Sequence, residues 1–108
     1  MNANQVVSAL SALAQDHRLA AFRLLVEAGE GGIAAGKIAE AIGVPNSSLS
    51  FHLTQLSEAG LIAQRRNGRS LIYSANYAAM SALMTYLTDN CCAGEDCAAP
   101  VNTTICEV

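Results

Sequence analysis

The sequence lacks the features that send a chain to or through a membrane. No run of about eighteen apolar residues occurs, which excludes a membrane-spanning helix. The stretch Met1–Gln5 carries no basic side chain and does not begin a secretory signal peptide. We therefore expect a cytoplasmic protein without a membrane partner. In that reducing compartment, four cysteines are expected to bind metal or sense redox rather than form a disulfide framework.

Basic residues are also scarce. The 108 residues contain six Lys and Arg against nine Asp and Glu, which gives a net charge of −3. That total alone argues against nucleic acid as a partner. The distribution argues the other way, because Arg65, Arg66 and Arg69 lie within five positions, while four of the acids fall in the last twenty residues. Local clustering rather than total charge makes a phosphate-binding surface.

The length allows one domain with a modest core, so dimerisation would add stability. Two expected helices, over residues 3–14 and 77–90, have broad apolar sides and almost no charge. A helix of this kind needs a partner surface. We therefore expect a homodimer formed through the first and last helices. Between them, Asp16 is expected to cap a second helix that ends at a glycine cluster, and residues 33–36 are expected to form a short connection.

A helix-turn-helix is predicted in the middle of the chain. A brief helix over residues 37–42 is followed by a turn at Gly43–Pro45 and by a helix that Asn46 or Ser47 would cap. Leu49, Leu53 and Leu56 form one apolar stripe on that helix. Its other side offers hydrogen-bonding groups that are not acidic, which suits base edges and phosphates in a DNA major groove. These candidate DNA contacts are Ser47, Ser48, Ser50, His52 and Gln55.

A β-hairpin is predicted directly after this helix. Residues 61–66 and 69–74 are β-capable runs separated by Asn67-Gly68, a strong hairpin signal. A helix-turn-helix followed by a hairpin is a winged helix. The expected fold is therefore mainly α with a β-hairpin, in the order α-α-α-α-β-β-α. Arg65, Arg66 and Arg69 would lie at the hairpin tip, where a wing reaches a phosphate backbone or a minor groove.

Each candidate DNA contact also has a purely structural interpretation. The serines could cap their helix, and the arginines could form a solvated hairpin tip. A histidine beside a leucine stripe, as at His52, is often a packed and hydrogen-bonded core residue. These alternatives stay open at the level of sequence. An enzyme is not expected, because no nucleophile, base and orienting group are clustered.

The composition changes after residue 90, and we divide the chain there into a DNA-binding and dimerisation domain (1–90) and a cysteine-containing tail (91–108). Cys91 and Cys92 are adjacent, and Cys97 follows five residues later. This spacing does not match the paired Cys-x-x-Cys units of zinc sites but suits three thiolates around a trivalent arsenic or antimony centre. A strained disulfide between Cys91 and Cys92 is the competing chemistry. Cys106 is spare or substitutes for Cys97.

Several stretches resemble the ArsR family of metalloregulatory repressors, over roughly residues 5–90. They are Ala20–Leu25, Ser47–Leu53, Ala59–Ile62 and the Arg65–Arg69 wing. The Asn90-Cys91-Cys92 ending resembles an arsenite-responsive branch with a C-terminal vicinal cysteine pair. The resemblance implies a homodimer that occupies operator DNA and leaves it when As(III) or Sb(III) binds, with no permanent cofactor.

The sequence departs from family patterns in three places. Residues 33–42 contain no cysteine, and the only histidines, His17 and His52, lie outside the last helix, so two inducer sites known in relatives are absent. We therefore expect the tail to be the sensor. Phe51 stands where many relatives have Arg or Lys, and it could contact a thymine methyl group. If only two thiols bind, a methylated arsenical becomes the expected inducer.

Overall fold

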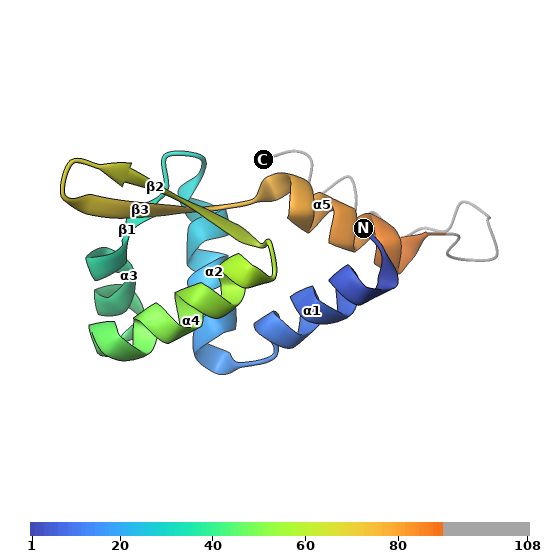
Figure 1. Cartoon of the computed structure of the whole chain (residues 1–108), viewed down its shortest axis with the longest axis horizontal. Coiled ribbons are helices and arrows are strands. Elements are labelled where there is room, and N and C mark those ends of the chain that lie inside the picture. Colours follow the sequence, from blue (N-terminus) through green and yellow to red (C-terminus); the bar gives the residue numbers. More distant parts are fainter. Residues whose placement is uncertain (90–108) are drawn as a thin grey trace.

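The computed structural model describes residues 1–89, and the four cysteines and the expected domain boundary lie outside the described residues. The described part is mainly helical with a small sheet, in agreement with the predicted winged helix-turn-helix (Figure 1). Its elements are α1 (Ala3–Leu13), α2 (Asp16–Ala28), β1 (Ile33–Ala34), α3 (Ala35–Ile42), α4 (Asn46–Glu58), β2 (Ile62–Asn67), β3 (Ser70–Ala75) and α5 (Tyr77–Thr88).

The sheet contains one strand that was not predicted. Its order is β1-β3-β2, and both pairings are antiparallel. Ile33 lies opposite Tyr73 in β3, so the expected connection over residues 33–36 is wrong: two of its residues form a strand and the other two begin α3. Gly32 permits this pairing, because its φ is +76° and a Cβ there would collide with the Tyr73 carbonyl oxygen. The partner strand is about forty residues away in sequence, so local pattern does not reveal it.

The hairpin turn lies one residue later than predicted. Asn67 pairs with Ser70 at the ends of β2 and β3, so the turn residues are Gly68 and Arg69 rather than Asn67 and Gly68. This register places Arg69 in the turn itself. Arg65 and Arg66 lie within β2, and because successive strand residues face opposite sides, their side chains leave opposite faces of the sheet.

Two helix starts also differ from prediction. The cap of α2 is Gln15, whose Oε1 accepts the Arg18 backbone N–H at 2.9 Å, and Asp16 is the first helical residue. There its carboxylate interacts favourably with the positive end of the helix dipole. Before α4 the capping position belongs to Pro45, which makes no side-chain cap hydrogen bond. The serines of α4 are therefore not used to cap the helix.

The core forms where α4 packs against α2, α3 and the start of the hairpin. The predicted stripe of α4 is confirmed, with Leu49, Leu53 and Leu56 all buried. Leu25, Ile38 and Leu61 are completely buried around it. The stripe buries side chains of α2, α3 and the start of the hairpin against one helix face. The rotation of α4 about its own axis is therefore determined by this packing.

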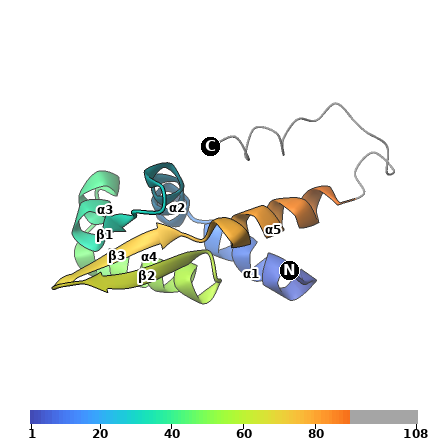
Figure 2. The ribbon, with the colours of Figure 1, turned by 90° about the horizontal axis from the view of Figure 1, so that it is seen from above.

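The helices α1 and α5 lie at the end of the molecule opposite the hairpin turn (Figures 1 and 2). Of their predicted apolar stripes, Val7, Leu10, Tyr86 and Leu87 are exposed to between 42% and 62%. The core-facing side of α1 is instead made by Val6 and two alanines. An apolar surface thus remains on both helices. Within residues 1–89, no helix has the length and apolarity to cross a membrane.

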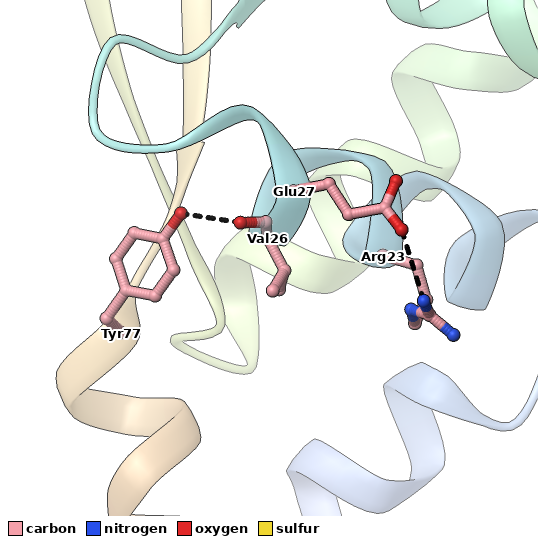
Figure 3. Close-up of polar contacts among 4 residues, drawn as sticks. All are labelled: Arg23, Val26, Glu27 and Tyr77. Carbon is pink, nitrogen blue, oxygen red and sulfur yellow. Dashed lines mark hydrogen bonds and ion pairs between the residues drawn. The ribbon is translucent and has the colours of Figure 1, made fainter. Parts of the chain in front are cut away.

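Hydrogen bonds attach the start of α5 to the rest of the domain. The Tyr77 hydroxyl donates to the Val26 carbonyl at 2.9 Å, near the C-terminus of α2 (Figure 3). Asn76 donates its backbone N–H to Leu61 at 2.8 Å and its side-chain amide to Gly60 at 3.0 Å. Asn76 and Tyr77 together join α5 to the end of α2 and to the junction between α4 and β2.

We expect Tyr77→Phe to lower the free energy of unfolding by about 1 kcal/mol, the usual net value of one hydrogen bond. The Val26 carbonyl would lose a partner, while the packing of the ring would be unchanged. Urea denaturation monitored by circular dichroism measures the change. Tyr73→Phe is the control, because Tyr73 is also partly buried against the core but its hydroxyl makes no hydrogen bond within residues 1–89. Equal losses in both variants would contradict the prediction.

Candidate nucleic-acid interface

The turn between α3 and α4 sets the start of the candidate recognition helix. Gly43 adopts a left-handed conformation with φ of 74°, which only glycine adopts readily. Its N–H and that of Val44 both donate to the Ala39 carbonyl, at 2.9 and 3.1 Å. The chain then passes through Pro45 into α4. This arrangement of two helices joined by three residues is the helix-turn-helix that the sequence predicts.

The outward face of α4 lies opposite its leucine stripe. At 3.6 residues per turn, Ser47, Phe51, Thr54 and Glu58 lie farthest from the core. Ser48 and Ser50 are also exposed, on either side of this line. Within residues 1–89, the hydroxyls of the three serines make no hydrogen bond, so the structure leaves them available to a ligand. The non-acidic surface ends at Glu58, in the last turn of the helix.

His52 and Gln55 lie on the flank of α4 that faces α1 and α2, and both are half-buried. The His52 Nδ1 is 3.5 Å from the Arg18 guanidinium, and its ring centroid is 5.5 Å from that of His17. Arg18 also donates its Nε–H to the Ala12 carbonyl at 2.7 Å, which holds the guanidinium in place. Gln55 and Arg18 line one shallow hollow between α1 and α4. His52 and Gln55 therefore lie apart from the outermost serines of α4.

The surroundings of His52 lower its pKa below the ordinary value of 6.5. Burial is the largest cause, and the positive charge of Arg18 and the neighbouring His17 act in the same direction. At neutral pH the ring is therefore uncharged, with Nδ1 able to accept from Arg18. An uncharged ring offers a phosphate a hydrogen bond but no charge.

The lowered pKa of His52 makes folding stability depend on pH in a definite direction. On acidification, His52 takes up its proton at a higher pH in the unfolded chain than in the folded one. The contribution of His52 to the free energy of unfolding is therefore fully present above pH 6.5 and decreases as the pH falls toward the lower pKa of the folded state. Urea midpoints between about pH 5 and pH 7.5 measure this slope. In His52→Gln, which cannot titrate, we expect a flatter profile over this range. An unchanged slope would mean that His52 does not contribute.

The three wing arginines have different surroundings. Arg65 donates to the Gly31 carbonyl at 2.9 Å, so its side chain extends from β2 to the loop before β1. Arg66 and Arg69 make no hydrogen bond or ion pair within residues 1–89. Arg65 thus braces the wing, whereas Arg66 and Arg69 present unpaired charge at and near the turn. Sequence spacing alone does not distinguish them, because the partner of Arg65 is thirty-four residues away.

Two further residues of α4 belong to the candidate surface. Phe51 lies at its centre and is 58% exposed, and Thr54 lies one turn further along. The sequence already indicates Phe51 as a possible contact to a thymine methyl group, and the helical spacing from Ser47 also identifies Thr54. Lys37 is exposed on α3. Within residues 1–89, no three His, Cys, Asp or Glu side chains are grouped so that they could hold a metal ion.

The described fold is that of a winged helix-turn-helix protein. A helix-turn-helix domain family matches residues 13–65. The chain is 30% identical to NolR from Sinorhizobium fredii, whose crystal structure it matches with a TM-score of 0.65 over 81% of this chain and 84% of that one. It is 28% identical, with a TM-score of 0.64 over 89% of each chain, to a homodimeric winged helix-turn-helix DNA-binding domain from Mycobacterium bovis, described as a possible ArsR-family transcriptional regulator.

Among curated proteins, the transcriptional regulator NmtR from Mycobacterium tuberculosis is 40% identical over 72 residues. The match includes 67% of this chain but only 58% of NmtR. By these likenesses the chain is an ArsR-like winged-helix regulator. The resemblance noted in the sequence is supported to that extent, and the arsenite-responsive branch stays a prediction.

Proposed function

We propose that this protein is a homodimeric repressor that binds operator DNA and leaves it when As(III) or Sb(III) binds to cysteine thiolates. Each α4 would enter a major groove, with half-sites about one helical turn apart. Cys91, Cys92 and Cys97 would bind the metalloid as thiolates and release protons. In this mechanism residues 1–90 bind DNA, and the cysteines that follow α5 bind the inducer.

The observation that supports the DNA-reading part is the outward face of α4. Its three serine hydroxyls are exposed, cap nothing and have no partner within residues 1–89. The unpaired guanidiniums of Arg66 and Arg69 lie in the adjacent hairpin. Hydroxyl groups contact base edges and phosphates, and arginines neutralise phosphates. With only two such arginines per wing, the charge-dependent part of binding should be modest.

The exposed apolar surface of α1 and α5 supports the proposed dimer. Val7 is 62% exposed and Leu87 57% exposed, and Leu10 and Tyr86 extend the apolar surface on the same two helices. Exposed apolar side chains gathered on two helices in this way are typical of a protein interface. The M. bovis relative described above is homodimeric. Pairing through these helices would set the distance between the two copies of α4.

The position of the cysteines in sequence supports the inducer part. Cys91 follows the end of α5 at Thr88 by three residues, and Cys91 and Cys92 are adjacent. A metalloid that joins these thiols would act next to the proposed dimer helix. Asn76 and Tyr77, at the start of that helix, are bonded to the elements that support α4. Because binding is reciprocal, operator DNA would weaken metalloid affinity by the same factor.

A thiol redox switch on the same fold is the second candidate function. The adjacency of Cys91 and Cys92 supports it, because a vicinal disulfide would also alter the segment after α5. The two candidates differ in what they require. A redox switch responds to an oxidant, whereas a metalloid sensor responds to arsenite while every thiol is kept reduced.

For the wing, we expect Arg66→Ala and Arg69→Ala to reduce the salt dependence of DNA binding. Each substitution removes two cations per dimer, so the slope of log K against log salt should fall by about 2. Fluorescence anisotropy with an operator duplex at several salt concentrations measures this slope. Arg65→Ala is the matched neighbour, and it should change the slope less because Arg65 is bonded to Gly31. Equal slopes in all three variants would contradict these separate roles.

For the inducer, we expect arsenite to release the fully reduced wild-type protein from operator DNA. Cys91→Ser and Cys92→Ser should keep DNA affinity and lose this release, because each lacks one of the required thiolates. A gel shift titrated with arsenite in excess reductant shows both properties. Release by an oxidant but not by arsenite would favour the redox switch instead.

The number of thiols at the site decides between inorganic and methylated arsenicals. A three-thiolate site predicts three sulfurs per arsenic by X-ray absorption and a loss of binding in Cys97→Ser. If Cys97→Ser binds and responds normally, the site uses two thiols, and methylarsenite becomes the expected inducer.

A further inference from the structure

Phe51 stands apart from the other exposed apolar residues of the described chain. It is 58% exposed, and it is the one large exposed apolar side chain of residues 1–89 that lies on α4. Those on α1 and α5 belong to the surface assigned to the dimer. Phe51 instead lies at the centre of the surface that would face DNA, one turn after Ser47. Its position therefore connects it to the ligand of α4.

The Phe51 ring and the Thr54 methyl group, about one helical turn apart, form an apolar strip on the outward face of α4. The Thr54 hydroxyl donates to the Ser50 carbonyl at 2.8 Å, so its only O–H donor is already used and its methyl group remains for contact. The Phe51 ring packs edge-on against His52, with centroids 5.8 Å apart and planes at 62°. Arg18 and His17 hold that imidazole in turn. The contact with His52 restricts the ring on one side and leaves the rest of it exposed.

A major groove offers one apolar group to such a strip, the C5-methyl group of thymine. Phenylalanine and threonine methyl groups are among the side chains that contact it. A phenyl ring placed against a polar base edge would instead leave that edge without a hydrogen-bond partner. We propose that Phe51, with the methyl group of Thr54, selects a T·A pair in each operator half-site through the thymine methyl group. This inference rests on the proposed reading of DNA by α4.

The test replaces thymine by uracil, which keeps Watson–Crick pairing and the O4 acceptor but lacks the methyl group. The full-length protein first selects its binding sequence from randomised duplex DNA. Each thymine of the selected half-site is then replaced singly by deoxyuridine. We expect one position per half-site to respond, with affinity about fourfold weaker when one half-site is changed, as for one buried methyl group. Changing both half-sites should weaken binding about sixteenfold.

Matched variants connect this effect to the side chain. Phe51→Gln should bind thymine and uracil duplexes equally, whereas Phe51→Leu should keep a preference for thymine. Thr54→Ser keeps the hydroxyl donor to Ser50 but removes the methyl group, and it should reduce the preference. Because both positions are exposed, melting temperatures should not change, which separates recognition from folding.

Three results would overturn the inference. If no sequence is enriched, α4 does not read DNA and the proposed function fails with it. If a sequence is enriched but Phe51→Gln still discriminates thymine from uracil, another residue contacts the methyl group and only the assignment to Phe51 fails. If Phe51→Gln keeps full DNA selectivity but changes the oligomeric state, Phe51 is a protein contact.

Discussion

The burial of the leucine stripe of α4 is the interaction on which the rest of the structure depends. Leu49 and Leu56 are 1% and 0% exposed. They belong to the same core cluster as Leu25, Ile38 and Leu61, which are each 0% exposed. Truncating any of these would cost about 2–5 kcal/mol, a large fraction of a small domain's stability. This packing determines which side of α4 faces outward. The availability of the serines and of Phe51 to a ligand is therefore a consequence of the core.

The wing and α5 are attached to this core by polar contacts at their bases. Arg65 braces the hairpin on Gly31, and Tyr77 with Asn76 attaches the start of α5 to α2 and to the α4–β2 junction. By contrast, both side chains of the Arg23–Glu27 ion pair, 3.1 Å apart, are exposed, so the pair contributes little to the stability of the fold (Figure 3).

In the proposed binding to DNA, charge would play a smaller part than it does in strongly basic DNA-binding domains. Of the six basic residues, Arg18, Arg23 and Arg65 bond to groups of the protein itself. Selectivity of α4 would then depend more on hydroxyl groups and on an apolar ring than on phosphate neutralisation. His52 adds no charge to this surface either, because burial lowers its pKa and leaves the ring uncharged beside Arg18 at neutral pH.

Local patterns in the sequence determined the helices, the hairpin and the family, because helical spacing and an Asn-Gly signal depend on neighbours in the chain. The same patterns identified Ser47, Ser48 and Ser50 as exposed and Phe51 as unusual. Tertiary structure alone decided the third strand, the one-residue shift of the hairpin turn and the different surroundings of Arg65 and Arg66. It also decided that His52 faces α2. The third strand, the Arg65 contact and the position of His52 each depend on a partner roughly thirty to forty residues away, and the sequence carries no local signal for such contacts.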